Sequence, residues 1–359
     1  MHGPRPGLLP APPPRVRSLS VQSWPAPDRI AWEAACAPGV RLRIRGGAAS
    51  HLKAVTRADL ARRYGCFLDF LARTGRLESF PHPGALITPG NVEPYVLELQ
   101  QRVSSVTVYG SICKLRRVAR IIAPHQDFGW LAELEADLRY EMRPRSKSNR
   151  LVSTQRLVAA GLTLMADAET AEKIPKLTRA RLFRNGLMIA VLACCPIRLK
   201  NYIALEIGRS FVQIKNVWWI VLSASETKER RADERPTPSF INEGINRYLR
   251  LYRPILLRRN SSLRALWVSS QFGAAMKYSY GAELIPQTTR STIGVSVSPH
   301  LFRTAAASTA ATHAAVTPHL ASALLHHTRP AVTEEHYNRA TTVSAAQAYA
   351  LITEEYRRR

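Results

Sequence analysis

The chain has 359 residues, with 51 Lys and Arg against 26 Asp and Glu, so its formal net charge is +25. This length suits two domains of about 100–200 residues each better than one. Hydrophobic residues make up 46% of the chain and charged residues 21%, a globular composition that excludes general disorder. The positive charge therefore belongs to folded surface and favours polyanionic partners, nucleic acid first and an anionic membrane surface second.

Several other classes of protein are excluded by simple patterns. The longest apolar run, residues 186–197, is 12 residues long, whereas a membrane span needs about 20. The five cysteines form no C-x-x-C pair and suit neither a disulfide framework nor a zinc site. No glycine-rich motif for a dinucleotide or a triphosphate is present. We therefore expect an intracellular, cytoplasmic protein without cofactor, metal or membrane association.

The N-terminal stretch is rich in proline and arginine. Residues 1–27 contain eight prolines, three arginines and no acid, and such a composition cannot bury a core. A short apolar piece, Asp28 to Cys36, precedes a glycine pair at Gly46 and Gly47. These features predict a flexible segment over residues 1–45.

Residues 46–140 are expected to form a helical domain. Thr56 followed by Asp59 is a capping-box pattern, and apolar residues recur after it at helical spacing until Gly75. Thr88 and Pro89 open a second predicted helix, although a further proline, Pro94, falls inside it.

A third helix of this domain, opened by Ser105 or Thr107, has an apolar side and a basic side. The basic side carries Lys114, Arg117 and Arg120, opposite a row of aliphatic residues. Such a stripe either lies along DNA or is an ordinary solvated face. Residues 141–150 then read as a basic linker, whose DNA-binding candidates are Arg143, Arg145 and Lys147.

Residues 151–359 predict a mixed domain. Helices come first, and short strands are expected at 211–212, 217–222 and 237–241, around a polar turn. An alanine-rich helical region with several histidines follows. The expected fold class is mainly α with a small antiparallel sheet, that is, α+β.

Six residues that can perform chemistry follow one another in this second domain. None is diagnostic alone, but together they form an R…K…H-x-x-R…H…Y series. Its members are Arg198, Lys228, His300, Arg303, His327 and Tyr337.

This series resembles the signature of the tyrosine recombinases of the phage-integrase family. The resemblance covers about residues 50–359 and is most specific from His300 to Tyr337. It implies a helical SAM-like core-binding domain followed by a tyrosine recombinase catalytic domain. It also implies a site-specific bacterial enzyme, associated with the nucleoid, that cleaves and rejoins double-stranded DNA through a 3′-phosphotyrosine link, as a homotetramer on DNA.

The chemistry of the side chains agrees with the implied roles. Arg198 and Arg303 suit the non-bridging phosphate oxygens, because a guanidinium pairs with phosphate through two parallel hydrogen bonds and stays charged at neutral pH. Tyr337 would be the nucleophile, and Lys228 would protonate the leaving 5′ oxygen. The two imidazoles, His300 and His327, would donate to the phosphate or accept the nucleophile's proton.

The sequence alone leaves some assignments within the site open. Tyr349 and Tyr356 are rival nucleophiles, His326 could take the role of His327, and a zinc site could use the histidine-rich stretch. Many relatives carry an acid three residues after the first arginine, where this chain has Asn201.

Assembly and activity are open as well. The predicted amphipathic helix at 343–356 could dock within its own chain or on a neighbouring copy. A type IB topoisomerase and a non-catalytic DNA-binding regulator would both share the implied fold.

Overall fold

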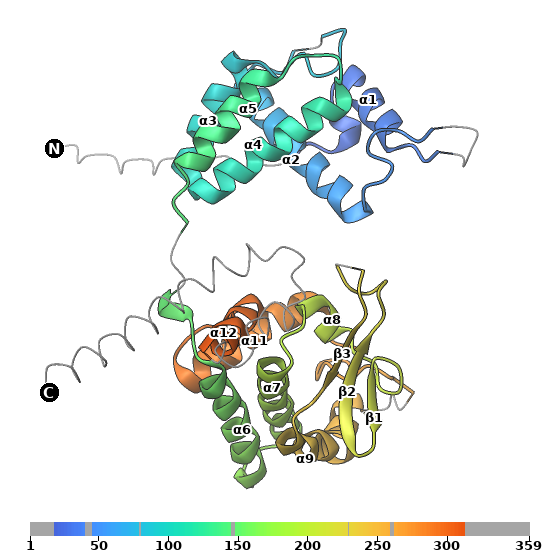
Figure 1. Ribbon diagram of the computed structural model, residues 1–359, viewed down its shortest axis with the longest axis vertical. Helices are drawn as coiled ribbons and strands as arrows, with labels where there is room; N and C mark the ends of the chain where they lie inside the picture. Colours follow the sequence, from blue (N-terminus) through green and yellow to red (C-terminus); the bar gives the residue numbers. More distant parts are fainter. Residues whose placement is uncertain are drawn as a thin grey trace, which may run out of the picture. The chain divides into compact units, whose positions relative to one another are not determined.

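A computed structural model describes residues 18–39, 45–78, 80–144, 148–228, 230–258 and 262–312 of the chain. The chain divides into two compact units, Met1–Ser146 and Lys147–Arg359, which we call the helical unit and the mixed unit. Each has its own hydrophobic core (Figure 1). His327 and Tyr337, the rival side chains at 326, 349 and 356, and the predicted helix at 343–356 lie outside the described residues, as do Arg145 and Lys147.

The described part of the helical unit consists of helices around one core. Its elements are η1 (Val21–Ser23), α1 (Ala26–Cys36), α2 (Ala54–Arg73), α3 (Pro89–Arg102), α4 (Ser105–Ile122) and α5 (Gly129–Tyr140).

Residues 18–39, the part of the predicted flexible segment 1–45 that the structure describes, are folded, which corrects the prediction for that part. Trp24 and Trp32 are each only 4% exposed, and the rings of Trp24 and Tyr64 form a T-shaped pair with centroids 4.8 Å apart. The buried carboxylate of Asp28 accepts hydrogen bonds from the Tyr64 hydroxyl at 2.6 Å and from the Gly84 N–H at 2.7 Å. Two tryptophans and one buried acid therefore anchor α1 in the core, despite the prolines that precede them.

The starts of α2 and α3 differ in how well the sequence predicted them. α2 begins at Ala54 after Lys53, and its N-cap makes no side-chain hydrogen bond, so the predicted capping box is wrong. The Asp59 carboxylate instead pairs with Lys114 at 2.6 Å. α3 begins at Pro89 after Thr88, as predicted.

The proline inside α3 is accommodated by a side chain from outside the helix. Pro94 has no N–H, so the carbonyl of Gly90, four residues earlier, lacks its usual helical partner. Nη1 of Arg76 donates to this carbonyl at 3.1 Å. This hydrogen bond gives the Gly90 carbonyl a partner in place of the missing one.

The mixed unit contains helices and a small sheet. Its described elements are η2 (Ser148–Arg150), α6 (Thr154–Thr170), α7 (Lys176–Cys194), α8 (Leu199–Ile203), β1 (Phe211–Ile214), β2 (Val217–Leu222), β3 (Asp233–Pro236), α9 (Ser239–Arg247), the π-helical η3 (Tyr248–Tyr252), α10 (Arg253–Leu257), α11 (Tyr278–Ile293) and α12 (Pro299–Thr312).

The centre of the mixed unit is α7, whose residues 186–193 are all buried. α6 packs against it with the two backbones in direct contact. A Cβ added at Gly161 would lie 2.7 Å from the carbonyl oxygen of Gly186, and one added at Gly186 would lie 2.6 Å from that of Gly161. Hence α7, which leads directly to Arg198, is held firmly against its neighbour.

The three strands form an antiparallel sheet in the order β1-β2-β3, at one side of the mixed unit (Figure 1). The prediction is right for β2 but wrong for the third strand, which runs over Asp233–Pro236 rather than 237–241. Pro238 caps α9 from Ser239 onward, and Thr237 turns back to donate to the Trp218 carbonyl. The fold is mainly α with a small antiparallel sheet, as the sequence predicted.

Candidate active site

Arg198 and Arg303 come together from distant parts of the mixed unit's sequence. Arg198 is half-buried at the N-cap of α8, just after α7 ends. Arg303 lies in the first turns of α12, is 8% exposed, and donates from Nη1 to the carbonyl of Pro196. This hydrogen bond ties the helix of the second arginine to the backbone immediately before the first.

The electrostatics of Arg303 reveal which other charges lie near it. Burial is the largest cause that lowers the pKa of Arg303 to about 10, and the positive charges of Arg198 and Arg235 lower it further. The carboxylate of Asp233 acts in the opposite direction. Among the described residues, three guanidiniums and one carboxylate therefore share this site, and the excess positive charge of this group favours a bound anion.

Asp233 and Arg235 enter the site from β3. Inward and outward positions alternate along this strand, and these two side chains occupy the buried ones. Nε of Arg235 donates to one oxygen of Asp233 at 2.6 Å, and Nη2 donates to the other at 3.0 Å. The Cys195 thiol, whose pKa burial raises to about 12, contacts the Pro236 carbonyl at 3.8 Å and joins β3 to the segment before Arg198.

His300 lies on the same helix as Arg303, three residues earlier. It is the second residue of α12, as the sequence predicted, and its side chain is exposed. Residues three apart on a helix share a face, so the imidazole stands near the rim of the arginine site.

Lys228 lies in the exposed turn between β2 and β3. The hydroxyl of Thr227 closes this turn, accepting from the N–H of Arg231 at 3.0 Å and donating to its carbonyl at 2.7 Å. Arg230, whose φ is +54°, and Arg231 are exposed in the same turn. Among the described residues, contacts link the segments that carry Arg198 and Arg303, but none links Lys228 to either arginine.

The predicted basic stripe on α4 divides into paired and exposed cations. Lys114 is paired with Asp59, whereas Arg117 and Arg120 are exposed and line a surface hollow of about 510 Å³ together with His51. Arg116 also lines it and pairs with Glu135 of α5 at 2.9 Å.

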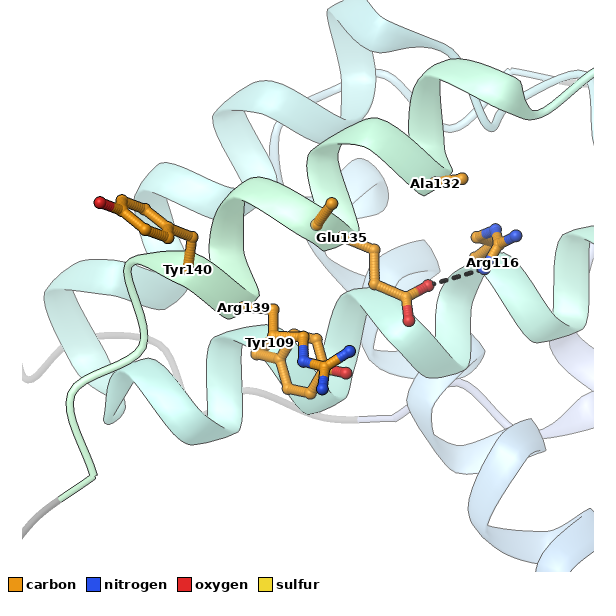
Figure 2. A pocket seen from close by; sticks show the side chains of 7 residues that line it. Tyr109, Arg116, Ala132, Glu135, Arg139 and Tyr140 are labelled. Carbon is orange, nitrogen blue, oxygen red and sulfur yellow. Dashed lines mark hydrogen bonds and ion pairs between the residues drawn. The ribbon is translucent and has the colours of Figure 1, made fainter.

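A second hollow, of about 540 Å³, lies on the other side of this ion pair, between α4 and α5. Figure 2 shows Tyr109, Arg139 and Tyr140 around it, with the Arg116–Glu135 ion pair at its edge. Basic and aromatic side chains therefore both line this face of the helical unit.

The first residues of the predicted linker are attached to α4. The Ser105 hydroxyl accepts from the N–H of Arg143 at 3.0 Å and donates to its carbonyl at 3.2 Å. The exposed Arg143 guanidinium donates to the Tyr140 carbonyl at 3.1 Å.

Neither a metal cluster nor a membrane span occurs within the described ranges. These ranges contain no group of three or more His, Cys, Asp or Glu that could hold a metal ion. They also contain no helix with the length and hydropathy needed to cross a membrane.

Comparison with known proteins identifies the fold. No family model and no curated protein sequence matches the chain. Among solved structures, the chain is similar to the XerH site-specific recombinase bound to difH substrate in a pre-cleavage complex, with a TM-score of 0.53 and 14% identity over 78% of this chain and 75% of that one. The XerA recombinase matches with a TM-score of 0.39 and 18% identity, over 84% of this chain and 94% of that one. This chain has the tyrosine recombinase fold.

The fold confirms the resemblance that the R…K…H-x-x-R…H…Y series indicated. Asp233 and Arg235 were not identified as site residues from the sequence. An acid and an arginine two positions apart, followed by Pro236, are typical of a polar loop. The available signal was their position directly after a hairpin turn, where residues two apart on a strand face the same side.

Proposed function

We propose that the protein is a site-specific DNA recombinase or integrase that cleaves and rejoins duplex DNA through a 3′-phosphotyrosine link at Tyr337. The observation that carries this proposal is the buried Arg303 beside Arg198, in a site where the charges of the described residues sum to a positive balance. Charge develops on the non-bridging oxygens when a phosphodiester is attacked, and fixed donors aimed at those oxygens lower the barrier. The tyrosine recombinase fold supports the same reading.

The proposed reaction has two balanced steps. In the first, the Tyr337 oxygen bonds to phosphorus while the bond to the 5′ oxygen breaks, and Lys228 gives that oxygen a proton. The tyrosine proton passes to His300 or His327. In the second step a 5′ hydroxyl of the partner strand attacks the phosphotyrosine and gives its proton to Lys228, and the tyrosine leaves with the proton that the histidine had received. The number of phosphodiester bonds is conserved, so the reaction needs no nucleotide triphosphate.

The two units divide the work in this proposal. The helical unit is the core-binding domain, with Arg117 and Arg120 of α4 as contacts to the DNA backbone. Residues 141–150 supply further cationic contacts through Arg143, Arg145 and Lys147. The mixed unit is the catalytic domain. Four copies assemble on two duplexes, because exchange requires one tyrosine for each of four strands.

The decisive experiment traps the covalent link. The full chain is incubated in EDTA with nicked duplexes that tile the DNA flanking its gene, because a nick lets the cleaved end diffuse away. We expect a protein–DNA adduct that Tyr337→Phe abolishes and Tyr349→Phe, the matched control, retains.

Different outcomes would separate the rival functions. Intact binding without an adduct on any duplex would indicate a regulator. Relaxation of plasmids that lack a special site, by a protein that stays monomeric in sedimentation on DNA, would indicate a type IB topoisomerase.

A further inference from the structure

The guanidinium of Arg235 is the third positive charge of the candidate active site. It is 8% exposed, and its position on β3 opposite Ile220 directs it to the buried side of the sheet. Its charge and that of Arg198 both act on Arg303. The contact between Cys195 and Pro236 joins its strand to the segment that leads to Arg198. These contacts place Arg235 within the arginine site rather than on the solvent side of the hairpin.

One edge of this guanidinium donates hydrogen bonds to Asp233, whereas the nitrogen on the other edge, Nη1, has no partner among the described residues. Asp233 takes Nε and Nη2 in a two-point pair, which fixes the plane of the group. Nη1 is fully buried and has no hydrogen-bond partner among the described residues. A charged donor in this state is costly, and a bound ligand, ion or water would offset that cost.

The charge balance points to the type of ligand. Among the described residues, two guanidiniums besides Arg235 lie in the site, and the carboxylate of Asp233 is already paired with Arg235. A tetrahedral oxyanion has several acceptor oxygens and could accept from all three guanidiniums together. A neutral ligand would leave their mutual repulsion unrelieved.

We propose that Arg235 is a third phosphate-binding arginine of the active site, which donates from Nη1 to the scissile phosphate. Asp233 is its positioning residue. The assignment of the phosphate as scissile rests on the proposed function, whereas the affinity of the site for an oxyanion does not. Asp233 also supplies, from β3, a carboxylate near the arginines in a chain that has Asn201 where many relatives carry an acid.

The test measures the affinity of the full chain for inorganic phosphate. Binding is followed by the rise in melting temperature with phosphate at constant ionic strength, each variant being compared with its own phosphate-free form. We expect Arg235→Gln and Arg303→Gln each to weaken phosphate binding about tenfold or more, as the loss of a charged hydrogen bond implies. The matched control is Arg231→Gln, which removes an exposed charge from the same hairpin and should leave the affinity unchanged.

A second, conservative variant keeps the test informative if Arg235→Gln fails to fold. Arg235→Lys keeps the positive charge, but an ammonium lacks the planar fork that pairs with both Asp233 oxygens while a further nitrogen faces the phosphate. We therefore expect this variant to weaken phosphate binding as well. Unchanged phosphate affinity in Arg235→Gln overturns the proposal, with or without a fall in melting temperature. The absence of any phosphate effect on the unsubstituted chain also overturns it. Neither result depends on the adduct assay, so failure of the DNA reaction is distinguishable from failure of this inference.

Discussion

The two units each bury a polar network, and the networks differ in whether they are complete. In the helical unit, both oxygens of Asp28 are taken, one by the Tyr64 hydroxyl and one by the Gly84 N–H. In the mixed unit, the network around Arg303 has excess positive charge, and Nη1 of Arg235 has no partner in the described part of the chain. A saturated network stabilises the fold. An unsaturated network with excess positive charge has room for an anionic ligand, and this difference separates the two networks.

The largest expected effect is on stability, from the saturated network. Asp28→Ala leaves the Tyr64 hydroxyl and the Gly84 N–H buried without an acceptor, so the free energy of unfolding of the helical unit should fall by about 2–5 kcal/mol. Tyr64→Phe removes only one of the two donors and should cost less. Urea unfolding followed by circular dichroism measures both, and phosphate affinity should stay as it is in the unsubstituted chain. A loss of phosphate affinity in Asp28→Ala would contradict the distinction between a stabilising network around Asp28 and an anion-binding network around Arg303.

The next effect concerns pH and the unsaturated network. Burial, then Arg198 and Arg235, lower the pKa of Arg303 to about 10. The guanidinium is charged below that value and loses its proton as pH rises through it. Affinity for sulfate, whose own charge is constant here, should therefore be flat from about pH 7 to 9 and then decline towards tenfold per pH unit.

A substitution sharpens this pH test. Arg235→Gln removes one cause of the lowered pKa of Arg303, so the decline should begin at a higher pH in this variant. Circular dichroism at each pH verifies that the protein remains folded. A sulfate affinity that does not change between pH 9 and 11 would argue against Arg303 as an anion-binding group.

The smallest effect belongs to the surface of α4. Arg117→Gln and Arg120→Gln should each weaken duplex binding a few-fold on any sequence, because an exposed phosphate contact carries no sequence information. The slope of log affinity against log salt should fall by about 1 for each lost contact. Lys114→Gln is the matched comparison and should change less, since Asp59 already pairs with that ammonium. Anisotropy of a labelled random duplex at several salt concentrations measures the slopes, and equal slopes in all variants would mark an ordinary solvated face.

Prediction from sequence succeeded where periodicity carries the information. The apolar row of α4 is buried, and α12 begins at His300 and its neighbours as expected. It failed where long-range contacts decide the structure. Trp24 and Asp28 are buried because they contact Tyr64 of α2 and the N–H of Gly84. The number of prolines in residues 1–27 carries no information about these long-range contacts.

The site followed the same rule. Arg198 and Arg303 were found because their order in the chain resembles a known series. Arg235 belongs to no such series, and its role depends on a strand register and a buried pair with Asp233 that only the folded chain displays.

The contact between Gly161 and Gly186 has a consequence for mutational tolerance. Neither position has room for even a methyl group, because each faces the other helix's backbone. Invariance at these two positions among homologues would therefore report steric exclusion and carry no information about DNA chemistry. An alanine there would be rejected in an active enzyme and in an inactive relative alike, which makes the pair a marker of ancestry of the fold and a poor marker of its activity.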